Sequence, residues 1–263
     1  MSKTATIGFL LAGVLVLGVS AAQAGQPAAP KKILKRTRSI MLGPKLKVKP
    51  GAWVSYILTA IPPKEAKMPK WEMRVKISLP IHADPEHPLL EGRYWMEIEF
   101  ADPRMNEEDL YMALKMLLKG DPRDGQSLKR VFFAAGNRNP MELPDKYIDK
   151  KTDEEPACYR ADPEGCAARG GKVRRFKEKK IYTKMGWIRA TRVVVRHPGR
   201  KGRAEFWISK QIPLFGLVRG STPTGLSLEL EAYGKGALSR IDESKAVPLP
   251  DLEELEKHLK GMP

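Results

Sequence analysis

Two stretches in the first half of the chain alternate strictly between apolar and polar side chains, and this two-residue period constrains the fold most. In residues 71–79 the apolar positions are Trp71, Met73, Val75, Ile77 and Leu79. Residues 93–100 repeat the pattern. Because successive side chains of a strand point to opposite faces, each stretch predicts a strand with one face on a core.

Other segments extend this pattern into a sheet. Further strands are expected at residues 52–60, 128–135, 187–196, 204–209, 214–222 and 226–233, with Pro- and Gly-containing turns between many of them. The last two pairs of segments are expected to form hairpins. Local hairpins with one apolar face predict a curled antiparallel sheet of about eight strands, an unclosed half-barrel.

Two helices are expected to cover the concave face, so the predicted fold class is α+β. The first follows Asn106, a possible cap, and ends at Gly120; its helical spacing comes from Leu110, Ala113, Leu114, Leu117 and Leu118. The second spans about residues 250–260. The expected organisation is a segment 1–24, an arm 25–50, the sheet domain 51–241 and a C-terminal helical segment 242–263.

The segment 1–24 has the pattern of an export signal. Lys3 precedes an apolar run at residues 7–19, and Ala22-Gln23-Ala24 is a small-x-small cleavage site. We expect cleavage after Ala24 and a soluble periplasmic product. The alternative is an N-terminal anchor that is not cleaved, although the run is shorter than the roughly 20 residues that a membrane span needs.

Positive charge is concentrated in two regions. The chain carries a formal net charge of +16, and residues 25–64 contain nine basic residues and no acidic one. Residues 169–203 are also basic, with Glu178 as their single acid. These regions favour an anionic membrane surface or an acidic envelope protein as partner, whereas nucleic acid is not expected for an exported protein. The alternative is a solvated face without a partner.

The two cysteines, Cys158 and Cys166, lie in a loop-like stretch rich in Pro, Gly and Asp. In an oxidising compartment we expect them to form a structural disulfide. A metal site would need more ligands than this stretch offers. A catalytic redox pair more often has C-x-x-C spacing.

No catalytic motif is present, so we expect a protein that is not an enzyme and that uses no cofactor or metal. Neither H-E-x-x-H nor G-x-S-x-G occurs in a suitable context. His82 and His87 are close enough in sequence to act as metal ligands, but they also suit an ordinary polar turn. Glu97 and Glu99 share one strand face, which we interpret as a solvated face rather than an acid–base pair.

One face of the predicted sheet is strongly apolar and is the candidate ligand-binding surface. It is either a closed core or, if the sheet is concave and partly uncovered, a cavity for acyl chains. The candidate residues are Val54, Tyr56, Leu58, Trp71, Met73, Val75, Ile77, Tyr94, Met96, Ile98, Phe206, Ile208, Leu228 and Leu230.

The C-terminal half resembles a known family. The run FWISKQIPLFGLVR at residues 206–219, followed by LELEAYG at residues 228–234, is similar to the LolA-like lipoprotein-carrier superfamily, which includes LolA and LolB. Residues 51–56 and 94–97 fit the same resemblance. It implies a half-barrel that carries lipid or lipoprotein acyl chains between membranes. The main alternative is an envelope interaction protein whose basic arm docks on an acidic partner.

Overall fold

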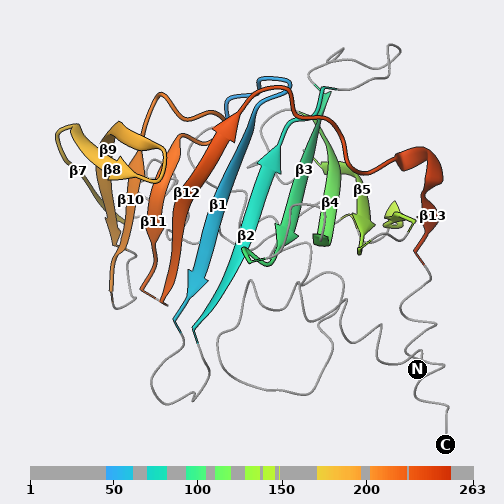
Figure 1. The fold of residues 1–263 in the computed structure, drawn as a ribbon, viewed down its shortest axis with the longest axis horizontal. Helices are drawn as coiled ribbons and strands as arrows, with labels where there is room; N and C mark the ends of the chain where they lie inside the picture. Colours follow the sequence, from blue (N-terminus) through green and yellow to red (C-terminus); the bar gives the residue numbers. More distant parts are fainter. Residues whose placement is uncertain are drawn as a thin grey trace, which may run out of the picture.

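The computed structural model describes one large curved β-sheet (Figure 1). The described residues are 46–61, 70–81, 93–104, 110–119, 128–136, 139–145, 148, 171–196, 202–223 and 225–249. The strands are β1 (Trp53–Ala60), β2 (Trp71–Ser78), β3 (Arg93–Ala101), β4 (Leu110–Lys119), β5 (Leu128–Ala134), β6 (Met141–Glu142), β7 (Lys172–Arg175), β8 (Lys179–Thr183), β9 (Gly186–Arg196), β10 (Ala204–Ile208), β11 (Leu217–Ser221), β12 (Leu226–Gly234) and β13 (Val247–Pro248).

The strand order is β13-β6-β5-β4-β3-β2-β1-β12-β11-β10-β9-β7, and β8 pairs with β9 outside this path. All pairs are antiparallel except the short parallel pair of β13 with β6. The first strand, β1, lies between β2 and the last long strand, β12. The two halves of the chain are therefore joined at the centre of the sheet, not at its edges.

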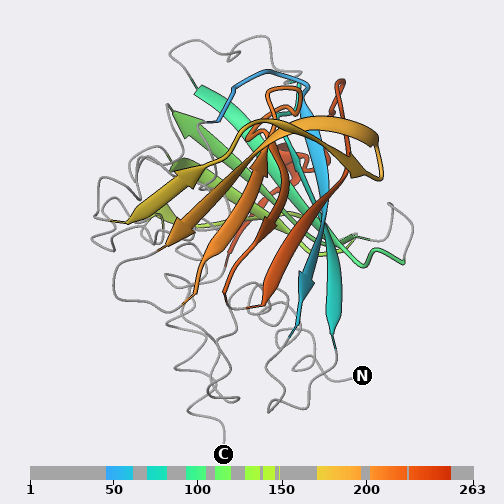
Figure 2. The ribbon, with the colours of Figure 1, turned by 90° about the vertical axis from the view of Figure 1, so that its left-hand side faces the viewer.

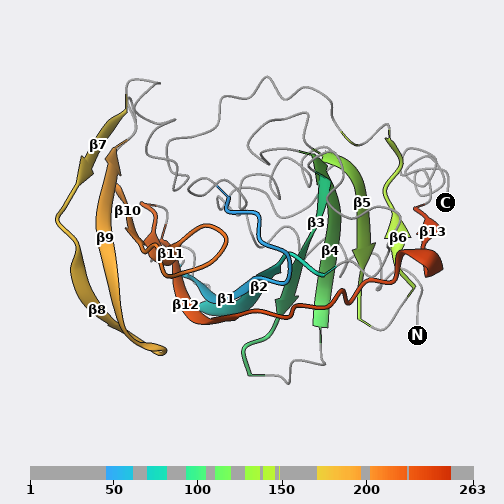
Figure 3. The same cartoon turned by 90° about the horizontal axis from the view of Figure 1, so that it is seen from above.

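The sheet bends into an open arc. Seen from above, β7 and β13 lie at opposite ends of the arc (Figure 3). The main core cluster includes fully buried side chains of the central strands, among them Val54, Met96, Ile98 and Leu230. Alternation places these residues on one face, so the predicted antiparallel sheet with one face on a core is confirmed in this part.

The expected first helix is wrong, because residues 110–119 form strand β4. Met112, Leu114, Met116 and Leu118 are buried on one face, and β4 pairs with β3 and β5 on either side. The apolar residues Ala113 and Leu117 occupy the opposite face, which is also covered. Because both faces are apolar, the two-residue period was hidden and a helical spacing could be found in the same residues.

The α+β class with helices over the concave face is therefore corrected to a nearly all-β fold. Within the described ranges the helical structure consists of the 3-10 turn Glu243–Lys245, labelled η5, and of Asp145, which also has a 3-10 conformation. The expected helix at 250–260 lies outside the described residues, while residues 242–249 form η5 and β13 instead of an α-helix. The described part of the chain holds no helix with the length and apolar character of a membrane span.

After β12 the chain crosses the outer, convex face of the sheet as a strap, residues 235–249 (Figure 3). The strap begins beside β1, where the backbone N–H of Ala237 donates to the carbonyl of Gly51 at 2.9 Å. It ends at the far edge, where the N–H of Val247 donates to the carbonyl of Pro140 at 2.9 Å. Ile241 of the strap packs in a second cluster with Trp95, Ala113 and Phe132.

The strap explains why the solvated-face interpretation of Glu97 and Glu99 is wrong. Both side chains lie under it, with 0% and 5% of their surface exposed. Glu97 accepts hydrogen bonds from the Ser239 hydroxyl and from the backbone N–H of Arg240 at 2.9 Å. The guanidinium of Arg240 lies 3.3 Å from Glu99.

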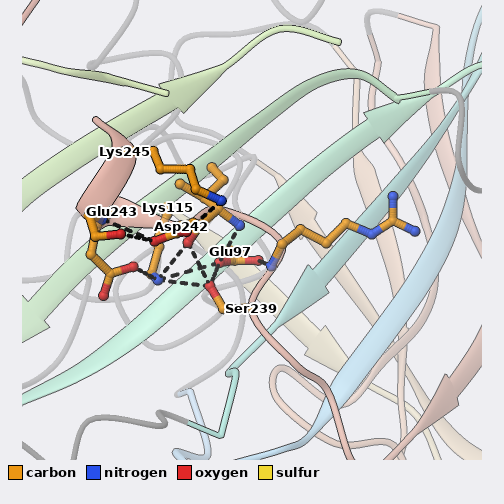
Figure 4. A network of polar contacts seen from close by, with 9 residues as sticks. Glu97, Lys115, Ser239, Asp242, Glu243 and Lys245 are labelled. Carbon is orange, nitrogen blue, oxygen red and sulfur yellow. Dashed lines mark hydrogen bonds and ion pairs between the residues drawn. The ribbon is translucent and has the colours of Figure 1, made fainter. Parts of the chain in front are cut away.

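Lys115 completes this buried polar network (Figure 4). Its ammonium group donates to the Ser239 hydroxyl at 2.8 Å, to the Ile241 carbonyl at 2.9 Å and to the Glu243 carboxylate. It also lies 3.9 Å from Glu97. Buried charges are tolerated only when they are paired and hydrogen-bonded, and these contacts satisfy that condition for both Glu97 and Lys115. The network therefore fastens the strap to β3 and β4.

Candidate binding pocket

A pocket of about 310 Å³ lies where β1 begins and β12 ends. Four lysines line it, Lys47, Lys49, Lys210 and Lys235, and no acidic residue does. Its remaining lining is Ala52, Gln211, Ile212, Pro213, Leu214, Tyr233 and Gly234. The pocket thus combines a cationic rim with a mainly apolar floor.

The turn between β10 and β11, residues 209–216, forms one wall of the pocket. It is closed by a hydrogen bond of 2.7 Å from the N–H of Ser209 to the carbonyl of Gly216. Leu214 has a φ of 57°, a left-handed conformation that is rare for a residue other than glycine. Its side chain is fully buried in the main core, which holds the turn in this conformation despite the strain.

The segment before β1 forms a second wall, next to this turn. The backbone N–H of Lys47 donates to the carbonyl of Leu214 at 3.0 Å, and the side chain of Leu46 is buried. The last residues of the expected arm, 46–50, therefore belong to the folded sheet. This contact places Lys47 and Lys49 beside the turn that carries Lys210.

Gly234, which lines the pocket, allows β12 to pack closely against the Trp53 ring of β1, which is not among the lining residues. A Cβ at this position would lie 2.8 Å from atoms of the Trp53 ring, a distance that real Cβ atoms essentially never show. The ring of Trp53 can therefore reach the end of β12 only because residue 234 is glycine. The ammonium group of Lys76 lies 5.4 Å from the centre of the same ring.

The charge of the pocket is not neutralised from within. The ammonium groups of Lys47, Lys49, Lys210 and Lys235 form no ion pair with a carboxylate of the described residues. Ala52, Ile212 and Leu214 of the floor are buried members of the main core cluster, and Tyr233 packs against it. A ligand that matches this site carries negative charge next to an apolar portion.

The residues predicted to line an apolar cavity lie together only in part. All except Phe206 and Ile208 belong to or pack against the main core cluster, and those two join a separate cluster with Val193 and Val195. Trp71, Ile208 and Leu228 are partly buried, and all the other predicted residues are buried. In this structure these side chains thus pack against one another in the interior of the fold.

Tyr56 is one of two tyrosines among these buried residues. Its hydroxyl donates to the carbonyl of Leu217 at 3.1 Å, which links β1 to β11 across β12. Burial raises the pKa of the Tyr56 phenol above its ordinary value. The hydroxyl therefore stays protonated and serves as a fixed hydrogen-bond donor.

Several predicted features lie outside the described residues. These are the cleavage site at Ala24, the cysteines Cys158 and Cys166, and the histidines His82 and His87. Within the described ranges, no three His, Cys, Asp or Glu side chains are grouped as a metal site requires.

The sequence did not predict that the four pocket lysines lie together, although each of them belongs to a segment discussed above or directly follows one. Lys47 and Lys49 were assigned to a basic arm, Lys210 lies inside the family-like run, and Lys235 follows its final glycine. No local period connects these positions. Their proximity depends on the β1–β12 pairing and on the contact of Lys47 with Leu214.

Comparisons with known proteins give structural likeness at low identity. No protein-family model and no curated protein sequence matches the chain. A hypothetical protein from Chlamydia trachomatis is 12% identical with a TM-score of 0.40, over 84% of this chain and 98% of that one. A Bacteroides fragilis protein provisionally described as exported, with a YmcC-like fold, is 12% identical with a TM-score of 0.32, over 73% and 100%.

A third structure, provisionally described as a lipoprotein from Parabacteroides distasonis, is 12% identical with a TM-score of 0.30, over 74% of this chain and 98% of that one. None of the three descriptions names a LolA-like carrier. Two of them describe the neighbour as an exported protein or as a lipoprotein. Likeness at these TM-scores carries no conclusion about the ligand or activity of this chain.

Proposed function

We propose that this protein binds anionic amphiphiles, molecules with a negatively charged headgroup and an acyl chain, in the bacterial cell envelope and catalyses no reaction on them. The observation that carries the proposal is the lysine-lined pocket with its apolar floor. The expected export signal supplies the location. Anionic phospholipids of the envelope belong to this chemical class.

The chemistry of the pocket supports a charged headgroup at its rim. Lysine ammonium groups bind phosphate and carboxylate as compact point charges, and a charged hydrogen bond contributes more than a neutral one. Four such groups without a carboxylate among the lining residues favour an anion over a neutral ligand.

The floor supports the apolar part of the ligand. Pro213 and Tyr233 are partly exposed and offer apolar surface next to the lysines, while Ile212 and Leu214 pack beneath them as buried core residues. The volume is at the lower end of the roughly 300–1,000 Å³ that is usual for ligand pockets. It therefore suits a headgroup and the first carbons of a chain more than a whole lipid.

The proposal can be tested with dodecyl phosphate as the probe, titrated into the purified mature protein by calorimetry. The double variant Lys47→Glu with Lys210→Glu should weaken binding by more than tenfold, since it reverses charge on two walls of the pocket. The matched control is Lys129→Glu with Lys172→Glu, which changes the net charge by the same amount at two exposed lysines on β5 and β7, far along the sheet from the pocket. This control should bind the probe like the wild type.

Two comparison ligands separate the parts of the proposal. Dodecyl maltoside, which has the chain without the charge, and inorganic phosphate, which has the charge without the chain, should both bind at least tenfold more weakly than dodecyl phosphate. Equal binding of inorganic phosphate would show a plain anion site. If the control variant loses binding to the same extent, the loss reflects the net charge of the protein, and the pocket is not the binding site.

A further inference from the structure

The β8–β9 ribbon carries an exposed aromatic pair at its tip. Tyr182 and Trp187 face each other across the two strands, with ring centres 5.5 Å apart in an edge-to-face arrangement. They are 67% and 69% exposed, and Met185 in the connecting turn is 47% exposed. Large apolar side chains grouped in this way on a surface mark an interaction site more often than single ones do.

The ribbon is held in place from its other side. Ile188 and Ala190 are buried in the main core cluster, and Ile181 packs against that cluster. Figure 2 shows β8 and β9 as a ribbon at this end of the sheet, and their residues alternate between the two sides. The aromatic pair is therefore presented on a supported strand pair and not on a loose loop.

Next to the aromatic pair, two positive side chains are placed opposite each other. Lys180 pairs in register with Arg189, on the same side of the ribbon as Tyr182 and Trp187. Like charges directly opposite on neighbouring strands destabilise a sheet. Neither side chain forms an ion pair with a carboxylate of the described residues. An anionic surface would remove this repulsion.

The surrounding strands are basic as well. Residues 171–196 contain ten basic residues, with Glu178 as the single acid. Arg192 is paired with Glu205 at 2.6 Å, so part of this charge is used inside the fold. Lys180 and Arg189 are exposed and extend the positive surface of the ribbon beside the aromatic rings.

We propose that the outer side of the β8–β9 ribbon, formed by Lys180, Tyr182, Met185, Trp187 and Arg189, docks on an anionic phospholipid bilayer. Trp and Tyr favour the interface between hydrocarbon and headgroups, where an apolar ring and a polar tip are both satisfied. Basic residues near an anionic leaflet add electrostatic attraction. This surface lies on β8 and β9, away from the residues that line the lysine pocket, and is independent of the proposed ligand.

Vesicle flotation tests the proposal. It compares phosphatidylcholine vesicles with vesicles that also contain about 30% phosphatidylglycerol, which makes their surface clearly anionic. We expect binding to the anionic vesicles alone, weakening as salt increases. Trp187→Ser with Tyr182→Ser should lower binding about tenfold or more, as should Lys180→Glu with Arg189→Glu. Thermal melting checks that the variants stay folded.

The pocket variant Lys47→Glu with Lys210→Glu is the matched control, because it changes the net charge by the same amount as the ribbon charge variant. It should lose dodecyl phosphate binding but keep vesicle binding within about threefold, while the ribbon variants should do the opposite. Equal loss of vesicle binding in both charge variants would overturn the ribbon proposal, as would retained binding in the aromatic variant. Binding to an acidic protein but not to vesicles would assign the surface to a protein partner instead.

Discussion

Glu231 connects three strands on the outer side of the sheet centre. Its carboxylate accepts hydrogen bonds from Nε of Arg74 at 2.8 Å, from Nη2 of Arg74 at 3.2 Å and from the Ser55 hydroxyl at 2.9 Å. Burial acts to raise the pKa of Glu231, but the hydrogen bonds from Arg74 and Ser55 and the charge of Arg74 outweigh it. The pKa of Glu231 is therefore lowered.

This lowered pKa predicts an acid-dependent loss of stability. A carboxyl group whose pKa is lower in the folded state stabilises the fold above its unfolded pKa, about 4.3 for Glu, and loses that effect as the pH falls through the folded pKa. We expect Glu231→Gln to lower the free energy of unfolding by about 1 kcal/mol at pH 7 and by progressively less below about pH 4.

Urea unfolding of both proteins between pH 7 and pH 3 measures this difference. The control is Glu229→Gln, which removes a more exposed ion pair with Arg219 and should change stability by less than about 0.5 kcal/mol. A difference between wild type and Glu231→Gln that stays constant with pH would contradict the role assigned to the charge.

At the scale of elements, the strap determines which strands of the sheet are buried on both faces. It covers β3, β4 and part of β5 on the outer face, so β3 and β4 are buried on both sides. Lys115 is held by the strap and also lies 4.8 Å from the centre of the Trp95 ring. Because the strap excludes water from this face, the charged side chains beneath it must pair with one another. On a solvated strand face, water would hydrate them instead.

Removing Lys115 should release the strap. In Lys115→Met the carboxylate of Glu97 stays buried without its cationic partner, and we expect a loss of about 3–5 kcal/mol in the free energy of unfolding. Denaturant unfolding measures the loss, and limited proteolysis at Arg240 or Lys245 reports release of the strap. Lys129→Met on the exposed side of β5 should change little.

The double variant Lys115→Met with Glu97→Gln distinguishes charge from packing. It buries no net charge while keeping an acceptor oxygen for the strap, so part of the lost stability should return. If the double variant is as unstable as Lys115→Met alone, the cost comes from lost packing of the lysine chain and not from the buried carboxylate.

At the scale of the whole molecule, the export predicted from residues 1–24 would decide which ligands the pocket and the ribbon can meet. We expect the mature protein to begin at Gly25, after cleavage behind Ala24, and to be recovered from the periplasm. N-terminal sequencing of protein from fractionated bacterial cells tests this. An intact N-terminus in the membrane fraction would support the anchored alternative and change how the ribbon reaches a bilayer.

The sequence by itself determined most of the strands, including β2, β3, β9, β10 and β12, because a half-buried strand records its environment in a local two-residue period. It also determined the uneven charge. It failed at β4, where a covered outer face removed the polar half of the period and left a pattern that a helix could share.

Only the tertiary structure decided the burial of Glu97 and Lys115 and the grouping of the four pocket lysines. Glu97 is buried by Ser239 and Arg240, far away in the chain, and Lys47 meets Lys210 through the backbone of Leu214. Such contacts leave no period in the sequence, since each depends on which strands pair and on where the chain crosses the sheet. The same side chains would be solvated charges in any fold that lacked the strap and the β1–β12 pairing.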